Sequence, residues 1–213
     1  MGNMTINNNK IDYFKVSLKE YKEIRPNKEL PSLLVHVCCG ACSCFPLLYL
    51  INLFDITVLF SNSNIYPYEE YNKRKQATLE YINYLNTKFN ANIKFIEDTY
   101  NYNEFRNDLI KYKDQKEGMD RCRICISKRL HNLFLYAIKY NFNYVTTIMS
   151  ISRNKNVYFI NEEGKRLENE FKGIRFLQFD FKKFNGQDVG VEISKKLNIY
   201  RQDYCGCEFS KGK

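Results

Sequence analysis

The sequence predicts an α/β fold in which a mostly parallel sheet has helices on both faces. Strand-like apolar runs alternate with segments of helical periodicity along most of the chain, which is the pattern of parallel sheets built from strand–helix–strand units. The 213 residues suit one domain with its own core, and no internal repeat divides them. Ligands of such open sheets bind at the carboxyl ends of the strands, so we expect the functional residues there.

The first half of the domain is expected to contain three strands and three helices. Apolar runs of strand length predict strands at residues 33–37 (LLVHV), 55–62 (DITVLFSN) and 92–98 (NIKFIED). Helical spacing of the apolar residues predicts helices at residues 42–54, 68–89 and 104–112. Pro46 fits the first of these helices, because proline is tolerated in a first turn.

The second half continues the same alternation. Apolar runs predict strands at residues 144–150 (YVTTIMS) and 173–179 (GIRFLQF). Helices are predicted at residues 122–140, 156–171 and 188–197. The first of these has one apolar face, which consists of Leu130, Leu133, Phe134, Ala137 and Ile138.

The first 30 residues are predicted to be an extension, and residues 31–213 the α/β domain. The extension has one short amphipathic pattern, YFKVSLKEYKEI, and Pro26 and Pro31 stand where the domain begins. The polar N-terminus lacks the apolar segment of a secretory signal, and the chain has no apolar run of membrane-spanning length. We therefore expect a cytoplasmic protein with no membrane partner.

The net charge is +9, from 33 Lys and Arg residues against 24 Asp and Glu residues. A basic surface favours nucleic acid as a partner. The chain is also rich in Asn, Lys, Ile and Tyr, a bias that an AT-rich genome produces without any functional reason. Charge alone therefore leaves both explanations open.

Eight cysteines occur in three groups, which lie at residues 38–44 (CCGACSC), 121–125 (RCRIC) and 205–207 (CGC). In a reducing compartment, clustered cysteines bind metal or catalyse more often than they form structural bridges. The first group follows the strand at residues 33–37, at its carboxyl end. Two pairs of thiolates from different elements suit zinc or an iron–sulfur cluster, and the sequence does not choose between these metals.

The second and third groups have their own chemical features. Cys122 and Cys125 open a predicted helix, whose N-terminal dipole, with Arg121 and Arg123, is expected to favour thiolates. Two cysteines one residue apart, as in CGC, can form a strained and labile disulfide. They can also be two ligands of a second metal, or simply two thiols.

Other polar residues near these segments are less specific. His36 and His131 are expected to be structural. The segment YRQDYCGCEFS contains Arg and Tyr side chains that can bind phosphate and stack on a base. The loops SNSNIYPYEEYNKR and SISRNKN follow predicted strands and should border the same pocket. The chain has no Gly-rich nucleotide-binding motif.

Six segments of the chain, in the same order, resemble the QueH family of epoxyqueuosine reductases. They are LLVHVCCGACS, SNSNIYPYEEYNKR, DRCRICISKRL, TTIMSISRNKN, FDFKKFNGQ and YRQDYCGCEFS, and they cover roughly residues 32–210. The sequence differs from the family pattern at Ala41, where relatives usually have proline, and at Arg153 and Asn154, which replace a common proline–histidine pair. Cys44 is additional, and many relatives lack the first 30 residues.

The resemblance implies a single Rossmann-like domain of the HUP or PP-loop type. It also implies two-electron reductive removal of the epoxide oxygen of epoxyqueuosine at the wobble position of tRNA, with a [4Fe-4S] cluster and an adjacent mononuclear iron as cofactors. The basic charge of the chain fits an anticodon stem-loop as partner. No motif indicates the electron donor.

The resemblance also assigns roles to individual residues. Cys38, Cys39, Cys122 and Cys125 would hold the cluster, and Cys205 with Cys207 would form a redox-active pair. The candidate ligands of the second iron are Cys42, Asp180 and Asp120. The candidate substrate-binding residues are Tyr200, Arg201, Tyr204, Asn64 and Arg153.

Two other classes of protein remain as alternatives. A tRNA sulfur-transfer enzyme of the ATP-pyrophosphatase type has a similar fold, but it needs an S-G-G-x-D-S loop after the first strand, where this chain has CCGACS. A zinc-stabilised RNA-binding protein would also use cysteine pairs. Such a protein would be colourless, whereas an iron–sulfur protein is brown.

Overall fold

A five-stranded parallel sheet is the centre of the computed structural model, which describes residues 11–24 and 29–211. The strand order is β3-β2-β1-β4-β5, with all neighbouring strands parallel. The strands are β1 (Ser32–His36), β2 (Asp55–Phe60), β3 (Lys94–Glu97), β4 (Tyr144–Thr147) and β5 (Arg175–Phe176). The α/β fold class predicted from the sequence is confirmed.

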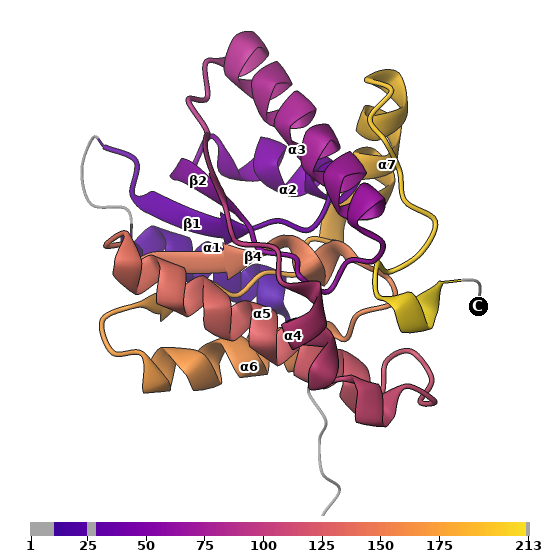
Figure 1. Ribbon diagram of the computed structural model, residues 1–213. Coiled ribbons are helices and arrows are strands. Elements are labelled where there is room, and N and C mark those ends of the chain that lie inside the picture. The colour runs from indigo at the N-terminus through magenta and orange to yellow at the C-terminus, as the bar shows by residue number, and fades with distance from the viewer. Residues whose placement is uncertain (1–10, 25–28, 212–213) are drawn as a thin grey trace, which may run out of the picture.

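Helices cover both faces of the sheet (Figure 1). One face packs against α2 (Gly40–Leu50), α3 (Tyr68–Phe89) and α7 (Gly186–Lys196), and the other against α5 (Asp120–Lys139) and α6 (Val157–Glu170). Successive side chains of a buried strand serve opposite faces. In β1, Leu33 and Val35 therefore join the core under α2 and α3, whereas Leu34 joins the core under α5 and α6.

The sheet has an edge at β5, where only two residues pair with β4. The predicted strand at residues 173–179 is therefore too long. Helix α1 (Tyr13–Ile24) packs beside this edge, where Glu20 accepts a hydrogen bond of 3.0 Å from the backbone N–H of Gln178. Helix α1 belongs to the segment predicted as an extension, and residues 1–10 and 25–28 of that segment lie outside the described residues.

Short elements complete the chain between these layers. Helix α4 (Tyr102–Asn107) and a 3₁₀ turn at Ile110–Tyr112 replace the single helix predicted at residues 104–112. Further 3₁₀ turns lie at Ile148–Ile151, Lys183–Asn185 and Glu208–Ser210. None of the helices within the described residues is long and apolar enough to cross a membrane.

The start of α2 fixes the position of the first cysteine group. Gly40 is the first residue of this helix, and a Cβ atom at Gly40 would lie 2.4 Å from the backbone oxygen of Ala77 in α3. Only glycine allows this close approach of the two helices. The tip of β1 and the first turn of α2 are thereby held against α3.

Candidate metal centre at the carboxyl end of the sheet

Two adjoining cavities lie at the carboxyl end of the sheet, with volumes of about 630 Å³ and about 60 Å³. Cys38 and Cys42 line the larger cavity, and Cys122, Cys125 and Cys207 line the smaller one. Glu117, Asn154, Lys155 and Cys205 line both. Cys205 therefore stands in the wall between the two cavities.

The first thiol group consists of Cys38, Cys39 and Cys42. Their sulfur atoms all lie within 4.8 Å of one another, which is close enough to hold one metal ion. The side-chain amide of Gln202 donates to the sulfurs of Cys39 at 3.0 Å and of Cys42 at 3.2 Å. Gln202 belongs to the C-terminal segment, which is thus joined directly to this group.

Mutual hydrogen bonding sets the protonation of this group. The sulfur of Cys38 accepts hydrogen bonds from the thiols of Cys39 and Cys42, so the pKa of Cys38 is well below its ordinary value. The pKa of Cys42 rises to about 11, chiefly because of its hydrogen bond with Cys38. Burial raises the pKa of Cys39. Cys38 is therefore the thiol of this group that loses its proton most readily.

The second thiol group consists of Cys122 and Cys125, in the first turns of α5. The backbone N–H of Gly118 donates to the sulfur of Cys122 at 3.2 Å. Burial nevertheless raises the pKa of Cys122, and it raises the pKa of Cys125 to about 12. The predicted preference for thiolates is wrong, because burial outweighs the N–H of Gly118 and the charge of Arg121, which both lower the pKa of Cys122.

The two arginines beside this group point elsewhere. Arg121 donates to the backbone oxygens of Tyr112, Lys113 and Gln115, and Arg123 lies over the ring of Phe159. Within residues 11–24 and 29–211, neither guanidinium has a hydrogen bond to a sulfur atom. Metal binding to Cys122 and Cys125 must therefore displace protons.

A buried network from α3 holds the turn that contains Cys205 and Cys207. Arg74, which is 2% exposed, donates to the backbone oxygens of Tyr204 and Cys205, both at 3.0 Å. The same guanidinium forms an ion pair of 2.7 Å with Glu70, and the hydroxyl of Tyr200 donates to Glu70 at 2.7 Å. We call Arg74, Glu70 and Tyr200 the α3 clamp. It fixes Cys205 in the wall between the cavities.

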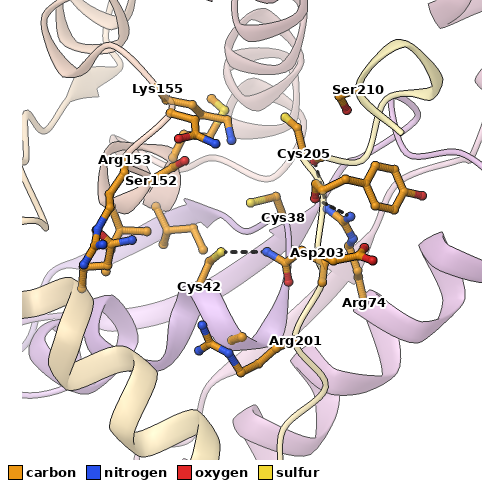
Figure 2. Close-up of a pocket in the computed structure, with 18 of the residues that line it drawn as sticks. Cys38, Cys42, Arg74, Ser152, Arg153, Lys155, Arg201, Asp203, Cys205 and Ser210 are labelled. Atoms are coloured by element: carbon orange, nitrogen blue, oxygen red, sulfur yellow. Dashed lines mark hydrogen bonds between the residues drawn. The ribbon is translucent and has the colours of Figure 1, made fainter. Parts of the chain in front are cut away.

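Figure 2 shows Cys38, Cys42 and Cys205 between Lys155 on one side and Arg74 on the other. Burial acts to lower the pKa of Lys155, but the thiols of Cys205 and Cys38 outweigh it, and this pKa is raised. Lys155 forms no ion pair with a carboxylate within residues 11–24 and 29–211. The larger cavity is therefore lined by cationic side chains, and the groups that can carry negative charge there are its sulfur atoms and the carboxylates of Glu117 and Asp203.

The chemistry of these donors fits a metal cofactor. Thiolates are soft ligands that suit iron–sulfur clusters and zinc. Buried cations without carboxylate partners need an anionic neighbour, and a metal held by several thiolates carries net negative charge. Cys38, Cys39 and Cys42 are the residues already close enough to share one ion, with Cys122, Cys125, Cys205 and Cys207 around the adjoining cavity.

Three of the five predicted substrate-binding residues line a cavity, and two do not. Arg153, Arg201 and Tyr204 line the larger cavity. Tyr200 does not line either cavity, because its hydroxyl is engaged by Glu70. Asn64 is buried and also lies outside both cavities.

The predicted acidic ligands and Cys44 lie away from the two cavities. Asp180 accepts a hydrogen bond from the backbone N–H of Lys182, and the exposed Asp120 accepts one from Gln115. Neither lines a cavity, whereas Asp203, which the sequence did not indicate as a ligand, lines the larger one. The thiol of Cys44 donates to the backbone oxygen of Gly40, which is a structural role.

Sequence reasoning found Arg153 and Arg201 but did not name three further cations of the site. Arg129 is buried and lines the smaller cavity, and Arg74 and Lys155 line the larger one. One signal was available, because Arg129 follows Cys125 by four positions in a helix and therefore lies on the same face. Arg74 and Lys155 belong to the two segments that the sequence places at the pocket, but no pattern distinguishes these two residues from surface cations.

Similarity to known proteins agrees with this arrangement of cysteines. A family model described as "Epoxyqueuosine reductase QueH" matches residues 33–213. The chain belongs to the QueH family. The cysteine groups described above are therefore the thiol groups of a QueH chain, and the resemblance noted from the sequence is confirmed.

Individual QueH proteins are similar over most of their length. The chain is 37% identical to epoxyqueuosine reductase QueH of Streptococcus pyogenes over 203 residues, which are 95% of this chain and 79% of the relative. The identity is 34% with QueH of Staphylococcus epidermidis, over 97% of this chain and 87% of the relative. The identity is also 34% with QueH of Thermotoga maritima, over 84% of this chain and 90% of the relative.

Proposed function

We propose that this QueH-family protein is an epoxyqueuosine reductase, which converts epoxyqueuosine at the wobble position of tRNA to queuosine. The observation that carries the proposal is the convergence of cysteines from three distant segments on two adjoining cavities. The reaction takes up two electrons and two protons and releases the epoxide oxygen as water. The site must therefore bind the substrate and supply both electrons and protons.

The cofactors that we propose are a [4Fe-4S] cluster and an adjacent iron. Cys38, Cys39, Cys122 and Cys125 would hold the cluster, and Cys42 is the thiol best placed to join them or the second iron. When bound, the cluster supplies single electrons and the iron a Lewis acid. Asp120 and Asp180 remain predicted ligands of the iron, and Asp203 is a third candidate because it lines the cavity.

The chain's own residues contribute binding, orientation and protons. Arg153, Arg201 and Tyr204 border the larger cavity, where they can bind phosphate and stack on a base. The α3 clamp holds Cys205 beside the cavity, so that Cys205 and Cys207 can act as a dithiol. The ammonium group of Lys155 faces the same space and can donate a proton to the departing oxygen.

The substrate tRNA is expected to bind mainly through charge. The chain carries a net charge of +9, and arginines stand at the margin of the cavity. Binding of an anticodon stem-loop should therefore weaken steeply between low and physiological salt, because bound phosphates release counterions. Filter binding at several salt concentrations measures this slope. A salt-independent affinity would mean that the charge of the chain reflects composition only.

The direct test is iron and sulfide analysis of protein isolated without oxygen, followed by an assay on tRNA that carries epoxyqueuosine. We expect a brown protein that produces queuosine in tRNA. Replacing Cys122 or Cys125 with Ser should bleach the visible band and abolish turnover. Replacing Cys205 or Cys207 with Ser should keep the band and lower turnover by orders of magnitude.

Two results would contradict these assignments. A colourless protein that contains only zinc would support the zinc-stabilised RNA-binding alternative. Loss of the visible band in the Cys205 variant would make Cys205 a ligand rather than one half of the redox pair. The Cys44→Ser variant is the matched control, because Cys44 is also a cysteine of the first group but donates only to a backbone oxygen.

A further inference from the structure

Arg129 is a buried cation without a carboxylate partner within the described residues. Arg129 is 3% exposed, and its Nε atom has no hydrogen-bond partner in the part of the chain that the structure describes. One terminal nitrogen donates to the side-chain oxygen of Asn62 at 2.9 Å. An uncompensated charge in the protein interior costs several kcal/mol, so such a residue is retained only where a negative group offsets it.

The groups that face Arg129 are thiols. Arg129 lines the smaller cavity together with Cys125 and Cys205, and the ionised forms of Cys38, Cys125 and Cys205 raise the pKa of its guanidinium against the effect of burial. They come from all three cysteine groups. Arg74, by contrast, has the carboxylate of Glu70 as its partner. Among the described residues, the sulfur atoms around the cavities are therefore the groups that can balance the charge of Arg129.

Asn62 holds Arg129 in this position. It follows β2 and is 1% exposed, and its side-chain N–H donates to the backbone oxygen of Val37 at 2.8 Å. Val37 directly precedes Cys38. The same amide therefore joins the guanidinium to the backbone that carries the first thiol group. This double contact sets the distance between the cation and the sulfur atoms.

We propose that Arg129, positioned by Asn62, sets the reduction potential of the metal centre by stabilising its more negative, reduced state. The proposal rests on the metal centre of the proposed function. Uptake of an electron adds one negative charge to a group held by cysteine sulfurs. A fixed cation in a poorly solvated site favours that state over the oxidised one. The centre can then accept electrons from a weaker reductant.

The experiment is a redox titration of the anaerobically isolated holoprotein with dithionite, followed by the visible band and by electron paramagnetic resonance. Arg129→Gln removes the charge, and we expect the ratio of reduced to oxidised centre at a fixed potential to fall at least tenfold. For a one-electron couple this corresponds to 59 mV in the negative direction. Arg129→Lys keeps the charge and should lie nearer to the wild type.

Asn62→Asp tests the same idea without removing the arginine. A carboxylate at this position pairs with the guanidinium and cancels its charge, so the midpoint should move in the same direction as in Arg129→Gln. This variant, with Arg129→Lys, decides the matter if Arg129→Gln does not fold or bind metal. Asn62 is a positioning residue, and a merely structural role would change stability without changing the midpoint.

Two control variants lie away from the cavities. Asn161→Asp buries a carboxylate at another amide that binds backbone atoms, and Arg166→Gln removes a cation whose side chain is 57% exposed. Neither should move the midpoint. A change of less than twofold in the ratio for both Arg129→Gln and Asn62→Asp, or an equal change in the controls, would overturn the proposal.

Failure of the proposed function gives a different result. A wild-type protein that shows a reversible midpoint but does not reduce epoxyqueuosine tRNA would refute the function and leave the inference about Arg129 intact. A wild-type protein without any reducible centre refutes both, and iron and sulfide analysis identifies that case before the variants are made. If the wild type has normal turnover and the midpoint does not change in Arg129→Gln and Asn62→Asp, only the inference about Arg129 is refuted.

Discussion

Removal of Arg74 should strongly destabilise the segment that carries Cys205 and Cys207. The substitution Arg74→Met removes the ion pair with Glu70 and the hydrogen bonds to two backbone oxygens. The side chain of Glu70 is 9% exposed and would be left with the hydroxyl of Tyr200 as its partner. Removing one partner of a buried ion pair costs about 3–5 kcal/mol, a large part of an ordinary stability of about 5–15 kcal/mol.

A double-mutant cycle tests this reasoning. We expect Glu70→Gln to cost less than Arg74→Met, and the double variant to be more stable than Arg74→Met alone, because no buried carboxylate remains unpaired. Urea unfolding of metal-free, reduced protein, followed by circular dichroism, measures the four free energies of unfolding. Alkylation rates of Cys205 and Cys207 show whether the segment detaches locally.

The reasoning about Arg74 fails under either of two results. One is an Arg74→Met variant within about 1 kcal/mol of the wild type, which is the cost of an ordinary hydrogen bond. The other is a double variant that is less stable than both single variants. Glu20→Gln is a suitable control. Glu20 is a buried carboxylate like Glu70, but it lies at the β5 edge, where it accepts a hydrogen bond from the backbone N–H of Gln178.

Three further predictions concern the same region. Gly206 has a φ of 117°, and an added Cβ would lie 2.9 Å from a nitrogen of Arg74, so Gly206→Ala should lower turnover at least tenfold while circular dichroism shows an intact fold. Burial lowers the pKa of His36 from its ordinary value of 6.5 to about 3. As the pH falls below 6.5, His36 therefore takes up a proton in the unfolded chain but not in the folded chain. The free energy of unfolding of the metal-free protein should fall by about 2 kcal/mol between pH 7 and pH 5. Urea unfolding at both pH values should show no such loss in His36→Gln. The raised pKa values of Cys42 and Cys125 mean that metal binding releases protons. The affinity for Zn²⁺ should therefore rise between pH 7 and pH 9, by about tenfold per pH unit for each proton released. Titration against a competing chelator measures this affinity.

The alternation of apolar and helical segments was sufficient to predict all five strands of the described sheet and the long helices. Errors occur where tertiary contacts decide. The strand predicted at residues 173–179 ends early because the N–H of Gln178 is bound by Glu20 of α1 instead of a neighbouring strand. Local pattern cannot show that a distant helix supplies this partner.

The candidate site divides in the same way. Cysteine spacing was enough to select the three groups, because thiols at close spacing are rare in a sequence of this kind. Arg153 and Arg201 were predicted at the cavity, but Arg74 and Lys155 were not, since they look like surface residues until the fold places them there. Tyr200 illustrates the reverse case, because a tyrosine expected at the substrate is engaged by Glu70.

The position of the cysteines along the chain has a consequence for biosynthesis. A ribosome makes the first group early, the pair in α5 midway, and the CGC turn only after every strand of the described sheet. A domain generally folds as a unit, so the sheet cannot be completed before β5 has been made. The nascent chain therefore carries the thiols of Cys38, Cys39 and Cys42 well before the other two cysteine groups exist. A metal ion delivered after translation meets all three groups, whereas a thiophilic ion such as Zn²⁺ that arrives early in synthesis meets only the first.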